Sequence, residues 1–358
     1  MKFGAFVSPG HPSLLLEKAK ILEENGFDSV WVEDEILLPF SSEEEIVPDL
    51  FPSLATIAVC TERVNVGSCV IDAGMRYPVK VAQAIATIDS IANGRMIAGM
   101  GAGEAINHDP YGIPTDHVYQ KMEEAIKCIK LLLTADYTHP ASFSGRFFSL
   151  RNAYLKIKSP RRPHTPLYIS AFGPKALRLA GSLGDGWISF SHTPETYERT
   201  LNGPIKTAAQ EAGKSLDMIG TVISIQTVLS KDLDMAARTA AAQAKDWIVL
   251  SPDNMKLIVP GSKHTLGRQP YCARAGREWT EKLEALSGQI PDRAALETTL
   301  WGDTASIIEQ VDRFAEAGCR HLIVYPAPLE RGAPVSLDRW SETIGEVGGK
   351  VIPYFKDM

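Results

Sequence analysis

The 358-residue sequence predicts an α/β protein with the architecture of a (β/α)8, or TIM, barrel. Short apolar runs rich in β-branched residues alternate with longer segments of helical period, a pattern typical of parallel βα units. Eight such runs occur, and eight strand–helix units form a closed barrel more simply than an open sheet. An open, doubly wound sheet is the alternative fold, because the pattern alone does not determine closure.

Each element is expected from its own local pattern. The expected strands are the short β-rich runs Phe3 to Val7, Ser29 to Val32, Val64 to Ile71, Met96 to Met100, Leu167 to Ala171, Gly186 to Phe190, Ile219 to Val228 and His321 to Tyr325. The expected helices are the segments with one apolar face, Leu14 to Glu24, Leu50 to Cys60, Val79 to Ala92, Val118 to Leu133, Ala176 to Leu183, Glu195 to Glu211, Met235 to Leu250 and Ala305 to Ala317. Several of these segments end at a glycine that terminates the helix, such as Gly26, Gly94, Gly213 and Gly318.

The chain is longer than a minimal barrel by about a hundred residues. Two stretches do not fit the strand–helix repeat: residues 143–157 alternate like a β-hairpin, and residues 251–300 are poorly periodic and rich in glycine and proline. Long insertions in barrels commonly cover or shape the active site. We therefore expect one barrel domain over residues 1–358, with substrate choice and dimer contacts located in these two insertions.

The charge balance argues against polyanionic partners. The 37 Lys and Arg residues against 43 Asp and Glu residues give a net charge of −6, which favours neither nucleic acid nor an anionic membrane surface. No apolar run approaches the roughly 18 residues of a membrane-spanning helix. The short apolar stretch at the N-terminus is broken by Pro9 and Pro12 before any cleavage signal, so a cytoplasmic location is expected.

The cysteines and histidines do not form a metal or disulfide pattern. Five widely spaced cysteines without a C-x-x-C motif favour neither a disulfide framework nor a structural zinc site. The eight histidines are scattered without the spacing of metal ligands. We therefore expect reduced thiols and no metal centre.

Carboxylates recur where the predicted strands end, and barrel active sites lie at that face. The acids that follow the second, third and fourth strands are Glu33, Asp34, Glu35, Asp72 and Glu104. Crowded or desolvated carboxylates have raised pKa values and can transfer protons, whereas helix caps and loop charges are the structural alternative. We favour function for Glu104 because it leaves a glycine-rich turn, in which Gly103 lets the backbone approach a ligand closely. His108 and His117, in the loop after Glu104, are more often solvated than pocket-lining in such a position.

A second glycine-containing turn follows the fifth predicted strand. Gly173 precedes Pro174 at the start of a helix, so that free backbone N–H groups point outward and suit a phosphate. Lys175 and Arg178 on the first turns of this helix also favour an anion. The structural alternative is an ordinary tight strand-to-helix turn.

Four stretches of the chain resemble the bacterial-luciferase-like superfamily of flavin and deazaflavin enzymes. They are GFDSVWVEDE, VNVGSCVIDAGMRYPVKVAQAIATIDSIANGRMIAGMGAGEAINHDPYG, AFGPKALRLAGSLGDGWI and WGDTASIIEQVDRFAEAGCRHLIVY. Within that superfamily they look most like the coenzyme F420-dependent reductases, which include phthiodiolone ketoreductase, methylenetetrahydromethanopterin reductase and F420-dependent glucose-6-phosphate dehydrogenase. The resemblance covers most of the chain except residues 251–300.

The resemblance implies a barrel that holds coenzyme F420 at its C-terminal mouth, with FMN as the alternative cofactor. It also implies a non-prolyl cis peptide at Cys69–Val70 in the third strand, where a bulge presses on one face of the ring. The basic run 156–164 is expected to be a solvated edge, although Arg161 and Arg162 offer contacts to an anionic cofactor tail.

The resemblance also assigns roles to single residues. Asp34 matches an acid near the ring, Glu104 a carboxylate close to the reacting edge, and Asn107 an amide that hydrogen-bonds the pyrimidine part. The phosphate-binding turn matches Ala171, Phe172 and Gly173. The expected catalytic residues are Glu104, Glu35 and Asp34, and the expected cofactor contacts are Asp34, Cys69, Val70, Asp72, Gly103, Glu104, Asn107, Ala171, Phe172, Gly173 and Lys175.

One residue departs from the pattern of the group. Many F420-dependent dehydrogenases of this kind have a histidine directly after the second-strand aspartate, where Glu35 stands here. Either Glu35 replaces the imidazole as a base, or Glu104 or a water molecule supplies a proton to an F420H2-dependent reduction.

The resemblance implies an oxidoreductase that transfers a hydride between the deazaflavin C5 and an organic carbonyl, imine or activated alkene. Its expected partners are a small-molecule substrate and a second copy of the chain in a homodimer. The alternatives are an FMN-dependent monooxygenase that needs a partner flavin reductase, and a non-catalytic flavin-binding paralogue.

Overall fold

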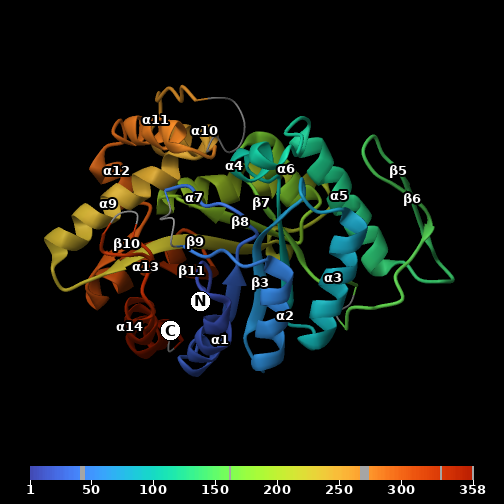
Figure 1. Ribbon diagram of the computed structural model, residues 1–358, viewed down its shortest axis with the longest axis horizontal. Coiled ribbons are helices and arrows are strands. Elements are labelled where there is room, and N and C mark those ends of the chain that lie inside the picture. The colour runs from blue at the N-terminus through green and yellow to red at the C-terminus, as the bar shows by residue number, and fades with distance from the viewer. Residues whose placement is uncertain (41–44, 161–162, 267–273, 331–332, 357–358) are drawn as a thin grey trace.

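Eight parallel strands close into a barrel in the computed structural model, which describes residues 1–40, 45–160, 163–266, 274–330 and 333–356 (Figure 1). Their order is β11-β1-β2-β3-β4-β7-β8-β9, and β9 pairs with β11 to complete the ring. The strands are β1 (Lys2–Phe6), β2 (Ser29–Val32), β3 (Asn65–Asp72), β4 (Met96–Gly101), β7 (Leu167–Ser170), β8 (Gly186–Phe190), β9 (Gly220–Leu229) and β11 (His321–Pro326). The (β/α)8 barrel is confirmed, and the open-sheet alternative is wrong.

Helices surround this ring at the expected places. The longer helices are α1 (Leu15–Glu24), α2 (Leu50–Cys60), α3 (Pro78–Ile91), α5 (Val118–Thr134), α6 (Pro174–Ser182), α7 (Pro194–Thr200), α8 (Lys206–Glu211), α9 (Leu233–Val249) and α13 (Thr304–Glu316). The short elements are η1 (Pro12–Leu14), α4 (Ala105–His108), η2 (Asp109–Tyr111), η3 (Leu201–Ile205), η4 (Leu216–Met218), η5 (Val347–Val351) and α15 (Ile352–Lys356). Among the described residues, no helix is both long and apolar enough to cross a membrane.

The last two strand–helix units differ from the expectation. Both α9 and α13 lie between β9 and β11, and the helix that follows β11 is α14 (Leu337–Glu346), where no helix was expected. Because α14 packs against β11 and α1, it belongs to the outer ring of helices. Its buried residues Trp340, Thr343 and Ile344, continued by Val347, recur at spacings of three and four, so the helical signal was present in the sequence.

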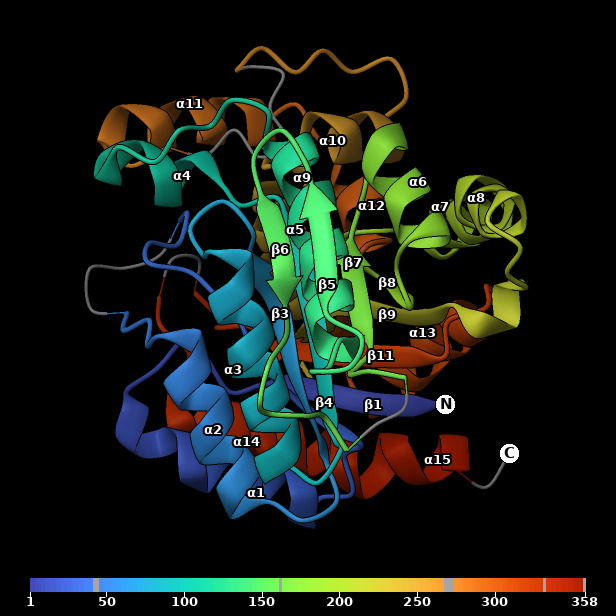
Figure 2. The same ribbon diagram turned by 90° about the vertical axis from the view of Figure 1, so that its right-hand side faces the viewer.

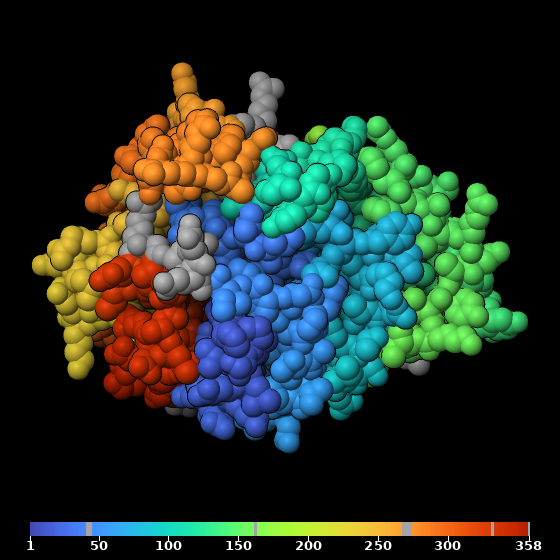
Figure 3. Space-filling model, viewed as in Figure 1, coloured from blue at the N-terminus to red at the C-terminus, as the bar shows by residue number. Residues whose placement is uncertain are grey.

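The described part of the stretch 251–300 is mainly helical and covers the mouth of the barrel. It contains α10 (Pro252–Ile258), α11 (Arg277–Ser287) and α12 (Asp292–Leu296), which pack on α9 (Figure 1). These helices share an apolar cluster with Ile106 of α4 and with Leu37 in the loop after β2. Arg274 also forms an ion pair with Asp109 at 2.9 Å. The orange surface of the insertion lies against the teal surface in Figure 3.

The other irregular stretch forms a hairpin outside the barrel. Strands β5 (Ala141–Ser144) and β6 (Ser149–Ala153) pair antiparallel beside α5 (Figure 2). The turn of the hairpin is held by Glu124 of α5, whose carboxylate accepts hydrogen bonds from the backbone N–H groups of Arg146, Phe147 and Phe148. A short strand β10 (Leu300–Gly302) pairs with the end of β9 beside the ring. The described cysteines, Cys60, Cys69, Cys128 and Cys319, are free thiols, whereas Cys272, Arg161 and Arg162 lie outside the described residues.

Trp31 fills the interior of the barrel. Its fully buried ring lies between Gly4 of β1 and Gly67 of β3, and a Cβ atom on either glycine would collide with the indole. The indole N–H donates to the Ser29 hydroxyl at 2.7 Å, and that hydroxyl is 2.7 Å from Nε2 of His321. Because the Trp31 ring fills this layer, the cavity described below lies above it, at the carboxyl ends of the strands.

Gly67→Ala is expected to destabilise the protein by about 2 kcal/mol or more, because the added methyl overpacks the Trp31 ring. Gly345→Ala is the matched control: Gly345 lies in α14 with no atom near its missing Cβ, so alanine should stabilise the helix by up to about 1 kcal/mol. Denaturant unfolding of both variants measures the two changes, and equal stability of Gly67→Ala and the wild type would contradict the packing argument.

Candidate active site

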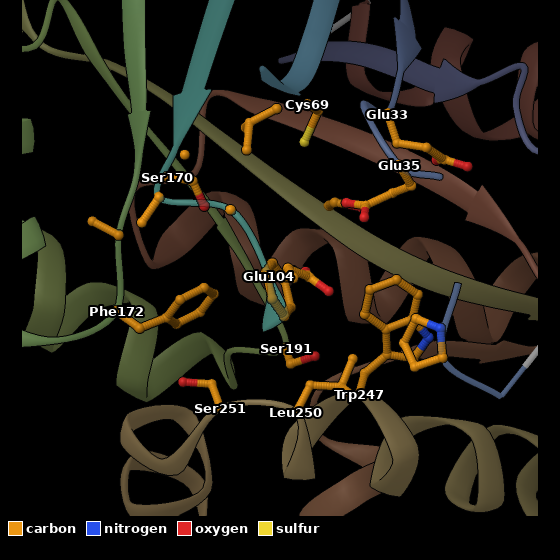
Figure 4. A pocket seen from close by; sticks show the side chains of 18 of the residues that line it. Glu33, Glu35, Cys69, Glu104, Ser170, Phe172, Ser191, Trp247, Leu250 and Ser251 are labelled. Carbon is orange, nitrogen blue, oxygen red and sulfur yellow. The ribbon is translucent and has the colours of Figure 1, made fainter. Parts of the chain in front are cut away.

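A cavity of about 1330 Å³, including the part open to solvent, lies at the carboxyl ends of the strands. All eight barrel strands contribute to its lining, through residues in their second halves or in the loops that follow them. Trp247 of α9, with Leu250 and Ser251 directly after that helix, covers the cavity from the other side (Figure 4). The acids of the lining are Glu33, Asp34, Glu35, Asp72, Glu104 and Asp253. The structure thus brings together the strand-end carboxylates that the sequence analysis selected.

Asp34 is held by an arginine that the sequence analysis did not select. The Arg76 guanidinium donates to both carboxylate oxygens of Asp34, at 2.6 and 2.7 Å, and also pairs with Asp49. Asp34 further accepts the backbone N–H of Asp72 at 3.0 Å. Burial raises the pKa of Asp34, while the Arg76 guanidinium opposes that rise. The contacts of Asp34 therefore tie the end of β2 to the end of β3.

Glu35 and Glu104 form the pair of carboxyl groups without a cationic partner in the described contacts. Both side chains are half-buried and point into the cavity (Figure 4). Burial and the neighbouring Glu104 carboxyl raise the pKa of Glu35 well above its ordinary value. Burial and the nearby Asp72 likewise raise the pKa of Glu104. Two close carboxyl groups with raised pKa values can hold a proton between them near neutral pH.

Asn107 has partners other than those expected. It is buried, does not line the cavity, and its carbonyl oxygen accepts the backbone N–H groups of Ile36 and Leu37 at 2.8 Å. Its amide nitrogen donates to the Glu35 carboxylate. In this structure Asn107 positions the loop after β2 and the carboxyl group of Glu35.

Glu33 is a buried carboxyl group at the floor of the cavity, one step above Trp31 on the same face of β2. Only 6% of its surface is exposed, and its Oε1 atom has no hydrogen-bond partner among the described residues. Burial raises the pKa of Glu33 to about 8, with a smaller contribution from Glu45. Glu33 is therefore largely protonated at neutral pH and available as a hydrogen-bond donor.

A buried Asp72–His108 pair supports the glycine-rich turn after β4. The His108 Nε2 atom lies 2.7 Å from the Asp72 carboxylate, and both side chains are at most 5% exposed. Gly103 has a positive φ of 80°, and a Cβ atom there would collide with Asp72 and His108. The solvated position considered for His108 is wrong, since this side chain packs beneath the turn that carries Glu104. His117, by contrast, is exposed at the surface.

The third strand carries the bulge that the resemblance implies. The Cys69–Val70 peptide bond is cis, and the register of β3 against β4 shifts between Ser68 and Ile71. Gly101 of β4 faces this bulge, where a Cβ atom would collide with the Val70 side chain. Cys69 and Val70 therefore form a convex part of the cavity wall.

The turn after β7 lies at the opposite side of the cavity. Ala171, Phe172 and Gly173 line the cavity, and Gly173 precedes the nine-residue helix α6, whose N-terminus has no side-chain cap. Lys175 is exposed and does not line the cavity, and Arg178 pairs with Glu211 at 2.9 Å. The nearest group from the insertion is the Asp253 carboxylate, which would collide with a Cβ atom at Gly173.

No group of three or more His, Cys, Asp or Glu side chains in the described part of the chain is placed to hold a metal ion. The residues that the sequence analysis missed are Arg76, Trp247, Leu250 and Asp253. The sequence contained only a weak indication of Arg76, which is a basic residue shortly after the acidic end of the third strand. The other three lie in or next to the insertion, where the sequence offered no motif.

The geometry agrees with comparisons to known proteins. The model of the luciferase-like monooxygenase family matches residues 1–321. The F420-dependent glucose-6-phosphate dehydrogenase of Beutenbergia cavernae is 30% identical over 93% of this chain and 92% of its own, and the 5,10-methylenetetrahydromethanopterin reductase of Archaeoglobus fulgidus is 27% identical over 99% and 100%. The solved structure of an F420-dependent secondary alcohol dehydrogenase with an F420-acetone adduct shares the fold, with a TM-score of 0.78, 24% identity and 98% coverage of both chains. The chain belongs to the luciferase-like monooxygenase family.

Proposed function

We propose that this protein is a coenzyme F420-dependent oxidoreductase that transfers a hydride between the deazaflavin C5 and an organic carbonyl, imine or activated alkene. The observation that carries the proposal is the Glu35–Glu104 pair, two carboxyl groups with raised pKa values that point into a cavity walled by the β3 bulge. The F420-dependent relatives support the choice of cofactor.

The described residues fit such a cofactor at three places. The convex wall at Cys69–Val70 offers an apolar surface for one face of a flat ring. The protonated acid Glu33, with an unpartnered oxygen, offers a hydrogen bond to a polar ring edge. The uncapped N-terminus of α6 offers backbone N–H groups to a phosphate. When bound, the deazaflavin supplies the hydride.

The side chains of the protein position the proton-donating groups and supply the proton. Glu104 is held by the turn that Asp72 and His108 support, and Glu35 is held by the Asn107 amide. Because burial favours their neutral forms, one of the two can donate a proton to a carbonyl oxygen as the hydride arrives at carbon. The arginine-bound Asp34 is a weaker candidate for this step, because its carboxylate already accepts three hydrogen bonds. It fits better as a positioning residue.

The cofactor assignment is tested by titration of the purified protein with F420 and, separately, with FMN. We expect F420 to bind with quenching of its fluorescence, and F420H2 to be oxidised when a ketone or imine is added. Tight FMN binding without a response to F420 would instead support the flavin-dependent monooxygenase. F420 binding without turnover of any ketone, imine or activated alkene would support the non-catalytic paralogue.

Glu104→Gln is expected to lower turnover by about 100-fold and to leave the Kd for F420 nearly unchanged, because the amide cannot donate the proton in the same way. In the wild type, ketone reduction should be fast while Glu104 is protonated and should fall as the pH rises through about 8. The variant should lack this alkaline decline. Glu17→Gln, at an exposed position of α1, serves as the control, and wild-type turnover in Glu104→Gln would refute the role.

Asp253→Asn is expected to tighten F420 binding by about three- to tenfold, because a negative charge next to the phosphate turn at Gly173 is removed. Asp217→Asn, which removes an exposed charge outside the cavity, should leave the Kd unchanged. Fluorescence titrations at low and high salt measure both values, and the gain should shrink at high salt. An unchanged or weaker affinity would show that the phosphate does not lie beside Asp253.

A further inference from the structure

A second cavity of about 1410 Å³, including its open side, adjoins the first. The two cavities share one wall, formed by Phe6, Leu38, Gln226, Trp247, Leu250 and Tyr325. The far side of the second cavity is formed by η1, the start of α14 and the segment before it. The two spaces together run from the Glu35–Glu104 pair towards the outer helices, and they are longer than a compact small substrate needs.

The second cavity is mainly apolar. Its lining beyond the shared wall contains Leu14, Phe40, Val335, Leu337 and Trp340, together with several prolines. The polar side chains of this lining are those of Ser8, His11, Lys18, Glu45, Gln243 and Asp246. Proline and aliphatic side chains cannot bind a sugar through hydrogen bonds, whereas they favour an aliphatic or aromatic group through burial of apolar surface. This wall is therefore suited to a hydrocarbon tail.

The charges of the two cavities disfavour an anionic substrate. No Lys or Arg is among the described residues that line the first cavity, whereas acids line it on several sides. Lys18 lines the second cavity, but it is only 4% exposed and its ammonium group donates to the carbonyl oxygens of Val7 and Pro9. Since the backbone N–H groups at the N-terminus of α6 are assigned to the cofactor's phosphate, a phosphorylated substrate would meet carboxyl groups without a free cation to balance its charge.

One polar group interrupts the shared wall. The Oε1 atom of Gln226 is buried and has no hydrogen-bond partner among the described residues. Gln226 lies in register with Tyr325, whose ring contacts Phe6 and Trp247. A hydroxyl group on the tail of a ligand that passes from one cavity to the other can donate a hydrogen bond to this acceptor, whereas a simple ketone has no donor for it.

We propose that the substrate is an uncharged, elongated carbonyl compound, whose reacting group lies beside Glu35 and Glu104 and whose apolar tail lies in the second cavity. This inference rests on the proposed function for the reacting end, and on the second cavity alone for the tail. Chain length should therefore determine affinity, since each additional fully buried methylene tightens binding by about fourfold.

The test uses 2-butanone, 2-hexanone and 2-octanone as probes, with their Kd values measured by calorimetry on the cofactor-free protein and on the protein saturated with F420. We expect the Kd to fall by about 50-fold or more from 2-butanone to 2-octanone. Leu14→Trp fills the second cavity and should remove this dependence while leaving the Kd for 2-butanone unchanged. Leu16→Trp, two residues further on at a 45% exposed position, is the control and should behave as the wild type.

Val335→Trp fills the same cavity from the segment before α14 and replaces Leu14→Trp if that variant unfolds below the wild-type Tm. A Kd that does not change with chain length, or saturable binding of glucose 6-phosphate, would overturn the inference. Length-dependent binding that Leu14→Trp removes, without any F420 binding or F420H2 oxidation, would uphold the second cavity and overturn the proposed function.

Discussion

The indole ring of Trp31 fits between two glycines, and this fit determines where in the barrel the cavity begins. Side chains alternate along β2, so Ser29, Trp31 and Glu33 share the inner face, and the Trp31 ring fills the layer that Gly4 and Gly67 leave open. The side chains around Trp31 are packed, and the first cavity lies beyond them at the carboxyl ends of the strands. Glu33 is thereby placed on the floor of the cavity, with few protein groups left to pair with it.

The same arrangement brings several acidic side chains together in a buried place, and only some of them are paired with a basic side chain. Several carboxyl groups meet at the strand ends, and burial makes each ionised form costly. Two of them obtain a partner: Asp34 binds Arg76, and Asp72 binds His108. Glu35 and Glu104 have no cationic partner among the described contacts, and burial raises the pKa of both carboxyl groups. Unequal pairing thus separates the acids that hold the loops in place from the acids that can exchange protons with a ligand.

Much of the fold and part of the site followed from local pattern. Strands and most helices were predicted within two residues, because apolar periodicity reports burial directly. Helix α14 was missed although its spacing was helical, because eight helical segments had already been matched to eight strands. Asn107 and Lys175 were expected at the cofactor, but Asn107 lies beneath the loop after β2 and Lys175 faces away from the cavity. A motif match identifies a position in the chain, and the surrounding packing decides where the side chain points.

The sequence by itself determined the eight barrel strands, the acidic strand ends and the two glycine-containing turns, because these depend on residue type and on spacing along the chain. Closure of the sheet into a barrel, through the pairing of β9 with β11, was decided by the tertiary structure. Only the tertiary structure decided which acids are paired, that His108 is buried, and that α9 to α12 form the roof of the site. Only the structure revealed the second cavity, whose walls come from η1, β9, α9 and α14. These features depend on contacts between residues far apart in sequence. Side chains become paired and desolvated only after the barrel has brought those residues together.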